Sequence, residues 1–316
     1  AALDARAPLT GEEAREIGSA EMAKATDRPG ASEPVWVYDA VLEEERRLDD
    51  PTPPVTYSTG FQQLDQITSG GWAPGQLAIL AARPGCGKTS LALQFAASAS
   101  GEGDPGALFV TLEMGVPEIT RVAISQRSGV SVTALRRRGL NATARKSATE
   151  GGKTYDRSRM WFDDRPRTLV DILARARRIR SQYGLGVLVV DYLQLVEVGG
   201  GRKNENRTEQ VGRLSRALKL LARDLGIVVI ALAQFNRAVE SREGNKPRLS
   251  DLRESGSLEQ DADIGMAIHR DTNPTTQKLD ETGKSELIVL KHRAGPTGII
   301  PMHFDGPTQR FNARLV

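Results

Sequence analysis

The stretch AARPGCGKTS at residues 81–90 constrains the fold more than any other part of the sequence. It overlaps the end of the apolar run LAILAA (77–82), which predicts a buried strand, and a helix is predicted from Lys88. A strand, a glycine-rich loop and a helix in this order can hold phosphate, because backbone N–H groups and the positive end of the helix point at the anion. The sequence therefore predicts a nucleotide-binding α/β domain.

One position of this loop departs from the template G-x-x-x-x-G-K-[ST], because Ala82 stands where the first glycine is expected. We expect it to be tolerated, since the strand leaves the sheet there and the methyl group need not touch phosphate. The Lys88 ammonium should neutralise the outer phosphates, and the Thr89 hydroxyl should hold Mg²⁺. The predicted nucleotide-binding residues are Arg83, Pro84, Gly85, Cys86, Gly87, Lys88, Thr89 and Ser90. Alkylation of Cys86 is expected to obstruct the loop.

Three polar residues at or near the predicted ends of apolar strands could supply hydrolytic chemistry, which depends on positioning and charge stabilisation. Asp191 ends GVLVVD (186–191), the usual place for a carboxylate that meets Mg²⁺ through water, or it caps a turn. Glu113 in VTLEMG is the candidate general base, the alternative being a solvated turn residue. Gln234 in ALAQFNR could sense the γ-phosphate or be an ordinary strand terminus.

From residue 56 onward, apolar strands alternate with helices. This pattern predicts a mostly parallel sheet covered on both faces, with an antiparallel pair near the C-terminus. Residues 129–159 are poorly patterned and carry no prediction. Helices are predicted near 116–128, 169–183 and 206–224, and strands at 77–82, 107–111, 160–164, 186–191, 227–233, 264–269, 285–291 and 298–304.

The N-terminal region is predicted to lie outside this domain. Residues 1–31 have few large apolar side chains and indicate a flexible tail or the remnant of a preceding domain. A helix near 34–48 has an apolar stripe that must dock on something, and DDPTPPV (49–55) indicates a linker. The predicted organisation is a tail at 1–31, a linker helix and Pro-rich linker at 32–55, and an ATPase domain at 56–316.

Composition limits the other possibilities. The 316 residues carry a formal net charge of +3, which permits a nucleic-acid partner without requiring one. One cysteine excludes an internal disulfide, and with three histidines it leaves little material for a zinc site. No membrane-spanning run or signal peptide is predicted, so a reducing cytoplasm is the expected setting.

From STGFQQLDQITSGGWAPGQL (58–77) almost to the end, the sequence resembles the C-terminal RecA-like ATPase domain of DnaB-type replicative helicases. The segments ARPGCGKT, TLEM, DYLQL, AQFNR, DLRESGSLEQDAD and LKHRAGPTG follow in family order, and the last two are specific to this branch. The family's loop commonly has Ala or Gly before Arg-Pro. The resemblance implies a RecA-like P-loop NTPase core, ATP or another NTP with Mg²⁺, and a homo-hexameric ring that moves 5′ to 3′ on single-stranded DNA.

The resemblance also implies roles for individual residues. Glu113 matches the catalytic glutamate, Asp191 the Mg²⁺-linked aspartate, and Gln234 the glutamine that links nucleotide state to the DNA loops. Lys291 and Arg293 in KHRAG match cations that reach a neighbour's γ-phosphate, although by themselves they would be interpreted as a solvated edge. Because a cation supplied in trans makes hydrolysis depend on assembly, a monomer should be nearly inactive.

Two basic loops are implied to line the DNA channel, although composition alone suggests ordinary solvated loops. They contain Arg202 and Lys203 (196–207), and Arg253, Glu254 and Gly256 (236–256). Binding through them should be sequence-independent and salt-sensitive.

Further partners and alternative functions follow from the same resemblance. The helix at 34–48 resembles the linker helix that packs on an adjacent subunit, and a helicase loader and primase are implied partners. The helical domain that engages primase is not recognisable in residues 1–31, which weakens that expectation. A RecA-like recombinase or signalling ATPase, or a non-catalytic nucleotide-gated ring, are the alternative functions.

Overall fold

The computed structural model describes residues 35–101, 103–137, 139–197, 207–235, 246–251, 256–271, 279 and 282–314. The chain divides into two compact units between Pro54 and Val55. In the first unit, the predicted helix is present as α2 (Val37–Asp49), which begins after Trp36. The predicted tail at 1–31 lies outside the described residues.

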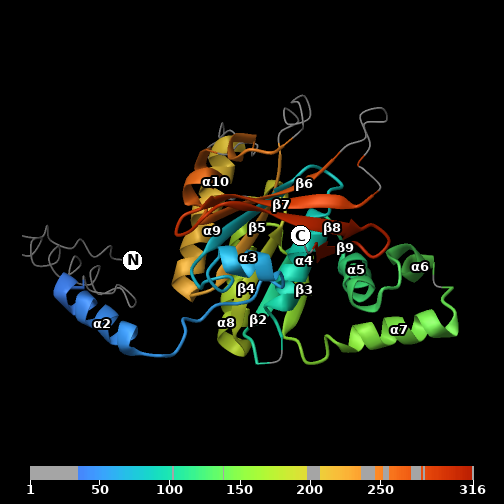
Figure 1. The fold of residues 1–316 in the computed structure, drawn as a ribbon, viewed down its shortest axis with the longest axis horizontal. Coiled ribbons are helices and arrows are strands. Elements are labelled where there is room, and N and C mark those ends of the chain that lie inside the picture. Colours follow the sequence, from blue (N-terminus) through green and yellow to red (C-terminus); the bar gives the residue numbers. More distant parts are fainter. Residues whose placement is uncertain are drawn as a thin grey trace, which may run out of the picture. The chain divides into compact units, whose positions relative to one another are not determined.

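The larger unit is built on one sheet, which has nine strands within the described residues (Figure 1). Its order is β3-β2-β4-β5-β1-β6-β7-β8-β9, in which the strands from β3 to β6 are parallel and those from β6 to β9 antiparallel. This confirms the predicted α/β fold with its antiparallel C-terminal extension. The strands are β1 (Leu77–Ala82), β2 (Gly106–Thr111), β3 (Met160–Asp163), β4 (Leu185–Asp191), β5 (Val228–Gln234), β6 (Ile264–Arg270), β7 (Lys284–His292), β8 (Gly298–Asp305) and β9 (Arg310–Ala313).

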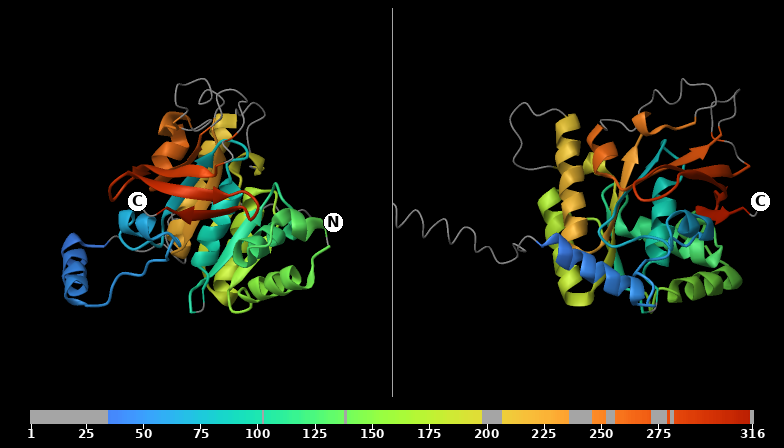
Figure 2. Two further views of the ribbon diagram at one scale, coloured as in Figure 1. Left: turned by 45° about the vertical axis from the view of Figure 1, so that its right-hand side comes forward. Right: turned by 60° about the vertical axis from the view of Figure 1, so that its left-hand side comes forward.

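Helices cover both faces of this sheet, as the two turned views show (Figure 2). The helical elements of the larger unit are α3 (Gln62–Ile67), α4 (Lys88–Ser98), α5 (Val116–Ser128), α6 (Val132–Arg137), α7 (Ala142–Lys153), α8 (Leu169–Tyr183), α9 (Arg207–Leu225) and α10 (Gly256–Asp261), with short 3₁₀ turns η1 (Leu193–Leu195) and η3 (Leu249–Asp251). One core cluster joins the strands to α4 and α5, and the other joins them to α8 and α9.

Strand β1 shows why its sequence is apolar throughout. Leu80 belongs to the core on the α4 face, whereas Ile79 belongs to the core on the α9 face. A strand buried on both faces has no polar positions to alternate with apolar ones, so it appears as a continuous apolar run. The phosphate loop therefore leaves the sheet from a strand that is paired on both sides, with β5 and β6.

Helices α6 and α7 lie within residues 129–159, where no helix or strand is predicted from the sequence. The Asn141 side chain accepts a hydrogen bond from the Ala144 N–H at 2.8 Å and caps the start of α7. A Cβ at Gly151 would lie 2.8 Å from the Ser128 Cβ, so α7 approaches the end of α5 closely at small residues. Because this contact needs few large apolar side chains, the helical pattern is weak. None of the described helices is long and apolar enough to cross a membrane.

Candidate nucleotide-binding site

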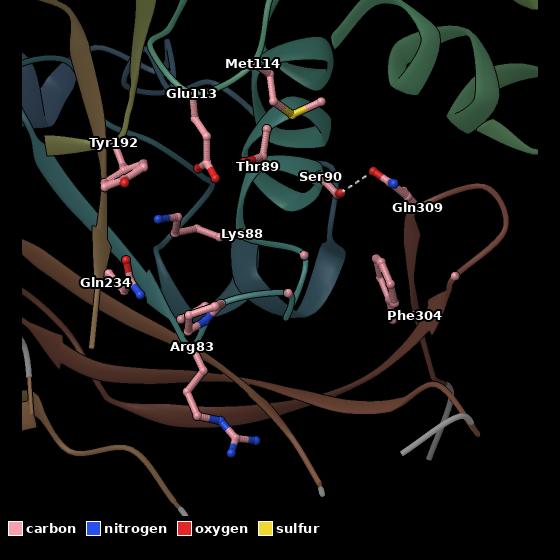
Figure 3. A pocket seen from close by; sticks show the side chains of 15 residues that line it. Arg83, Lys88, Thr89, Ser90, Glu113, Met114, Tyr192, Gln234, Phe304 and Gln309 are labelled. Atoms are coloured by element: carbon pink, nitrogen blue, oxygen red, sulfur yellow. Dashed lines mark hydrogen bonds between the residues drawn. The ribbon is translucent and has the colours of Figure 1, made fainter. Parts of the chain in front are cut away.

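A cavity of about 350 Å³ lies beside the phosphate loop, at the edge where β1, β4 and β5 end (Figure 3). A volume of this size is within the usual range for small-molecule sites. Five separate segments of the larger unit converge there. The lining residues are Ala82, Arg83, Pro84, Gly85, Gly87, Lys88, Thr89, Ser90, Glu113, Met114, Tyr192, Gln234, Phe304, Gly306 and Gln309.

The loop has the predicted strand–loop–helix form. Strand β1 ends at Ala82 and α4 begins at Lys88, so the methyl group of Ala82 lies at the exit from the sheet. Gly85 and Gly87 have φ values of +76° and +91°, which side chains rarely adopt. A Cβ on Gly87 would also lie 2.9 Å from ring atoms of Phe304 and Phe311. Glycine is therefore needed at position 87 by the backbone and by the aromatic rings packed against the loop.

Thr89 and Asp191 lie together at the first turn of α4. The Thr89 hydroxyl donates a 2.6 Å hydrogen bond to Oδ2 of Asp191. The other carboxylate oxygen, Oδ1, is buried without a partner among the described residues. Burial raises the pKa of Asp191, opposed by the Lys88 charge and the Thr89 hydrogen bond. A buried oxygen ligand with a free lone pair beside a phosphate loop fits Mg²⁺, which binds through one or two protein oxygens together with phosphate and water.

Lys88 extends into the same cavity and is largely buried. Its desolvation lowers its pKa, whereas the charges of Asp191 and Glu113 raise it. The Lys88 Nζ lies 4.5 Å from the centre of the Tyr192 ring, within range of a cation–π interaction. Tyr192 was not among the predicted residues, although its position directly after Asp191 in DYLQL could have signalled it.

Glu113 and Gln234 both line the cavity (Figure 3). Gln234 is the last residue of β5 and lies opposite Ala82 in the strand register. Glu113 does not end a strand, because β2 stops at Thr111 and Glu113 follows in the turn before α5. The Thr111 hydroxyl donates to the Met114 carbonyl at 2.7 Å, which holds this turn in place.

The opposite end of the cavity is formed by the turn between β8 and β9, which the sequence did not reveal. There the Ser90 hydroxyl donates to Oε1 of Gln309 at 3.3 Å (Figure 3). The buried Gln126 side chain donates to the carbonyl of Ser90 at 3.0 Å and to that of Gln309 at 2.7 Å. Gln126 thereby joins α5, α4 and the β8–β9 turn.

Two of the predicted loop residues turn their side chains away from the cavity. The Arg83 guanidinium donates to the Arg270 carbonyl at 2.8 Å and points away from Lys88 and Glu113 (Figure 3). The Cys86 thiol is fully buried in the core and does not line the cavity. Burial raises the pKa of Cys86. Any contribution of Cys86 to phosphate binding is therefore left to its backbone.

Lys291 and Arg293 lie at the opposite edge of the sheet from the cavity. Strand β7 is antiparallel to β6, and Lys291 is paired with Gly265 near the start of β6. Lys291 donates to the Glu259 carbonyl, and Arg293 donates to the Gln260 carbonyl at 2.8 Å. Neither residue contributes to the cavity lining of its own chain.

Most of the predicted DNA-contacting residues lie outside the described part of the chain. Arg202, Lys203, Arg253 and Glu254 are among them, whereas Gly256 is the first residue of α10. The two segments that contain them follow the ends of β4 and β5 and therefore leave the sheet from the edge that holds the cavity.

Three features together define a P-loop NTPase. They are the glycine loop that follows the central strand β1, the hydrogen-bonded pair Thr89–Asp191, and the mostly parallel sheet. Residues 56–313 match the model of the DnaB-like helicase C terminal domain. The chain belongs to this family.

Individual relatives support the same assignment. The chain is 42% identical over 255 residues to the replicative DNA helicase DnaB of Leifsonia xyli subsp. xyli, covering 80% of this chain and 55% of that protein. A solved ATPase domain matches with a TM-score of 0.78 at 30% identity, covering 90% of this chain and all of that one. A solved DnaB-like replicative helicase, studied with its interactions with primase, matches with a TM-score of 0.75 at 30% identity, covering 94% of this chain and 71% of that chain. The chain spans between half and two thirds of the length of the curated relatives it matches.

Proposed function

We propose that this chain is the motor module of a replicative DNA helicase, which uses ATP hydrolysis to move along single-stranded DNA and separate the duplex. The observation that carries the proposal is the convergence of Lys88, Glu113 and Gln234 on one cavity, beside the Thr89–Asp191 pair. Membership of the helicase family supports the DNA-directed part of the function.

Each of these side chains has a proposed chemical role. Mg²⁺, when bound between Thr89 and Asp191, would supply positive charge at the β- and γ-phosphate oxygens. Lys88 binds the outer phosphates as a cation; desolvation lowers its pKa, and the charges of Asp191 and Glu113 offset part of that effect. Glu113 orients and deprotonates the attacking water, and Gln234 responds to the γ-phosphate from the end of β5. These assignments rest on position in the cavity and on the family resemblance.

The proposed active assembly is a homo-hexameric ring in which Lys291 and Arg293 act on the nucleotide of a neighbouring subunit. Their place at the far edge of the sheet supports this, because they do not reach the cavity of their own chain. Helix α2 (Val37–Asp49) carries apolar residues, none of which is buried, and is the proposed linker helix.

Single-stranded DNA is the proposed partner of the two basic segments that follow β4 and β5. Contacts from Arg202, Lys203 and Arg253 to phosphate would make binding independent of sequence and weaker at high salt. A solved relative was studied with primase, which makes primase a candidate partner of the protein. A helicase loader is a further candidate that rests on the family resemblance alone.

The test compares the chain with its Lys88→Ala variant in ATP hydrolysis and in unwinding of a forked DNA with a free 5′ tail. We expect DNA-stimulated hydrolysis and unwinding, both reduced at least about 100-fold by Lys88→Ala, since a missing phosphate cation costs several kcal/mol of transition-state stabilisation. Lys153→Ala is the matched control, because Lys153 is an exposed lysine at the end of α7.

Other outcomes would favour other functions. Filament formation with strand exchange would indicate a recombinase, and full function without Glu113 would indicate a passive nucleotide-gated ring. Unchanged ATP hydrolysis in Lys88→Ala would refute the assigned site.

A further inference from the structure

A second cavity, of about 600 Å³, lies in the larger unit at the other end of α4 from the phosphate loop. Five separate parts of the chain form its walls: the segment before α3, the C-terminal half of α4 and the residues after it, the end of α5, the turn after α7, and the start of β9. Its size is that of a small-molecule site. The motor function proposed above does not use it.

The lining of this second cavity is rich in hydrogen-bond donors and contains no carboxylate. Arg127 and Arg310 contribute two exposed guanidinium groups, and no salt bridge joins either of them to a carboxylate of the described residues. Arg310 donates only a 3.3 Å hydrogen bond to the Gln126 carbonyl. Ser98 and Thr154 also line the cavity, and the Thr154 hydroxyl donates to the Gly151 carbonyl at 2.7 Å. Two uncompensated cations in one cavity favour an anion.

Tyr155 gives a second indication that the cavity binds a polar ligand. Its hydroxyl oxygen is buried, and its O–H has no acceptor among the described residues, although the Arg127 guanidinium is close enough to act as a donor to it. The Arg127 guanidinium lies 5.5 Å from the centre of the Tyr155 ring. Burial raises the pKa of Tyr155 more than the neighbouring Arg127 lowers it, so the hydroxyl keeps its proton and can donate. A buried donor without a partner is costly, and a ligand oxygen would satisfy it.

The amide side chains of Gln126 and Gln94 connect the walls of the second cavity to the elements around the nucleotide cavity. Gln126 lines the second cavity, and its side chain holds the carbonyls of Ser90 and Gln309, two residues that line the first. Gln94 accepts a hydrogen bond from the Phe311 N–H at 2.8 Å and donates to the Phe311 carbonyl at 2.9 Å. A ligand that moves Arg310 therefore acts on the β8–β9 turn, which closes one end of the nucleotide cavity.

We propose that this second cavity binds a small phosphorylated anion through Arg127, Arg310 and Tyr155, and that its occupancy alters nucleotide affinity through Gln126 and the β8–β9 turn. A phosphate group fits better than a carboxylate because its three acceptor oxygens match the many donors of the lining. The site does not depend on the motor function, since none of its side chains contacts Lys88, Glu113 or Asp191 in the described structure.

The binding test uses the Lys88→Ala variant, which weakens phosphate binding at the first cavity. Pyrophosphate and adenosine monophosphate are titrated by isothermal calorimetry, with citrate as a carboxylate of similar charge. We expect saturable binding of at least one phosphate compound, weakened about tenfold or more by Arg127→Gln with Arg310→Gln, because charge-assisted hydrogen bonds are lost. Arg177→Gln, a change at an exposed arginine of α8, is the control and should have no effect.

Tyr155→Phe adds a variant that retains both cations and the shape of the ring. It should weaken phosphate binding several-fold while leaving the melting temperature of the free protein equal or higher, since it removes a buried O–H without an acceptor. Three results would overturn the site: absence of saturable binding, affinity unchanged in the double arginine variant, or citrate bound as tightly as pyrophosphate.

The proposed coupling is tested with Lys88 intact. A fluorescent ATP analogue is titrated with and without pyrophosphate, in the native chain and in the Arg127→Gln, Arg310→Gln variant. Direct competition at the first cavity affects both proteins equally, so the coupling is the part of the affinity shift that the variant loses. Equal shifts in both proteins would show that the two cavities are independent.

Discussion

The nucleotide cavity and the edge that bears Lys291 and Arg293 lie at opposite ends of the same strands. At the cavity end, β1 ends at Ala82, which is paired with Gln234 of β5 and Ile268 of β6. At the other end, Ile264 of β6 is paired with His292, next to Lys291. From Ile264 to Ile268, strand β6 is on the order of 13 Å long at about 3.3 Å per residue.

The two ends also differ in how complete they are. The cavity is preorganised, with Lys88 largely buried near Asp191 and Glu113. Arg293 is exposed and is held by its own chain, through the Gln260 carbonyl and a 3.3 Å ion pair with Asp263. Under the proposed assembly, the cavity supplies the phosphate-binding part of the reaction centre, and the far edge carries the cations proposed to act on a neighbouring copy of the chain.

The largest effect on activity is expected from a substitution at the far edge that leaves the nucleotide cavity unchanged. Arg293→Ala should lower the ATPase kcat about 10³-fold, because a cation supplied to the γ-phosphate in trans contributes roughly 10³–10⁵ to the rate. Nucleotide affinity should stay within about twofold, since the cavity of the same chain is intact. Steady-state hydrolysis with single-stranded DNA and equilibrium nucleotide titration measure the two quantities.

Mixing variants tests whether the two ends meet between chains. Arg293→Ala protomers retain a complete cavity, and Glu113→Ala protomers retain the cation. Mixed together, they should recover part of the turnover that neither has alone. Arg216→Ala on α9 serves as the control for loss of an exposed arginine. Fast turnover by a strictly monomeric chain, or no recovery on mixing, would contradict the division between the two ends.

Much of the strand end that holds the nucleotide cavity could be predicted from the sequence. Strands buried on both faces leave continuous apolar runs, and LAILAA and GVLVVD therefore located β1 and β4. The residue that follows such a run in a parallel sheet lies at the ligand-binding edge, which is why Lys88, Asp191 and Gln234 could be named.

The remainder depended on contacts that no local pattern encodes. Gln309 enters the cavity only because the β8–β9 turn packs on Ser90, more than two hundred residues earlier in the chain. Helix α7 has few large apolar side chains because it contacts the end of α5 at small residues, Gly151 and Ser128. The location of Lys291 at the far edge follows from the antiparallel direction of β7 relative to β6, whereas the sequence predicted only the last strand pair to be antiparallel.

A smaller effect should come from the aromatic ring inside the cavity. Tyr192→Leu removes the face on which the Lys88 ammonium rests, and a desolvated cation–π contact is worth up to about 2 kcal/mol. We expect about tenfold weaker nucleotide binding in Tyr192→Leu, and binding within about twofold of the native value in Tyr192→Phe, which keeps the ring. Fluorescent nucleotide titration of both variants measures this. Equal losses in the two would mean that the hydroxyl, and not the ring, supports Lys88.

The last prediction concerns the core side of the phosphate loop, at Cys86, and the effect of its labelling on activity is the smallest expected here. Its thiol is fully buried and its pKa is raised by burial, so at pH 8 less of it is thiolate than in a free cysteine. We expect alkylation of the folded chain to be at least about tenfold slower than that of the unfolded chain, and to accelerate as the pH rises through the raised pKa. Timed mass spectrometry with a bulky maleimide, with and without denaturant, gives both rates. Rapid labelling of the folded chain would show that the loop opens on its core side. If fully labelled protein then kept its ATPase activity, the thiol would have no part in shaping the phosphate loop.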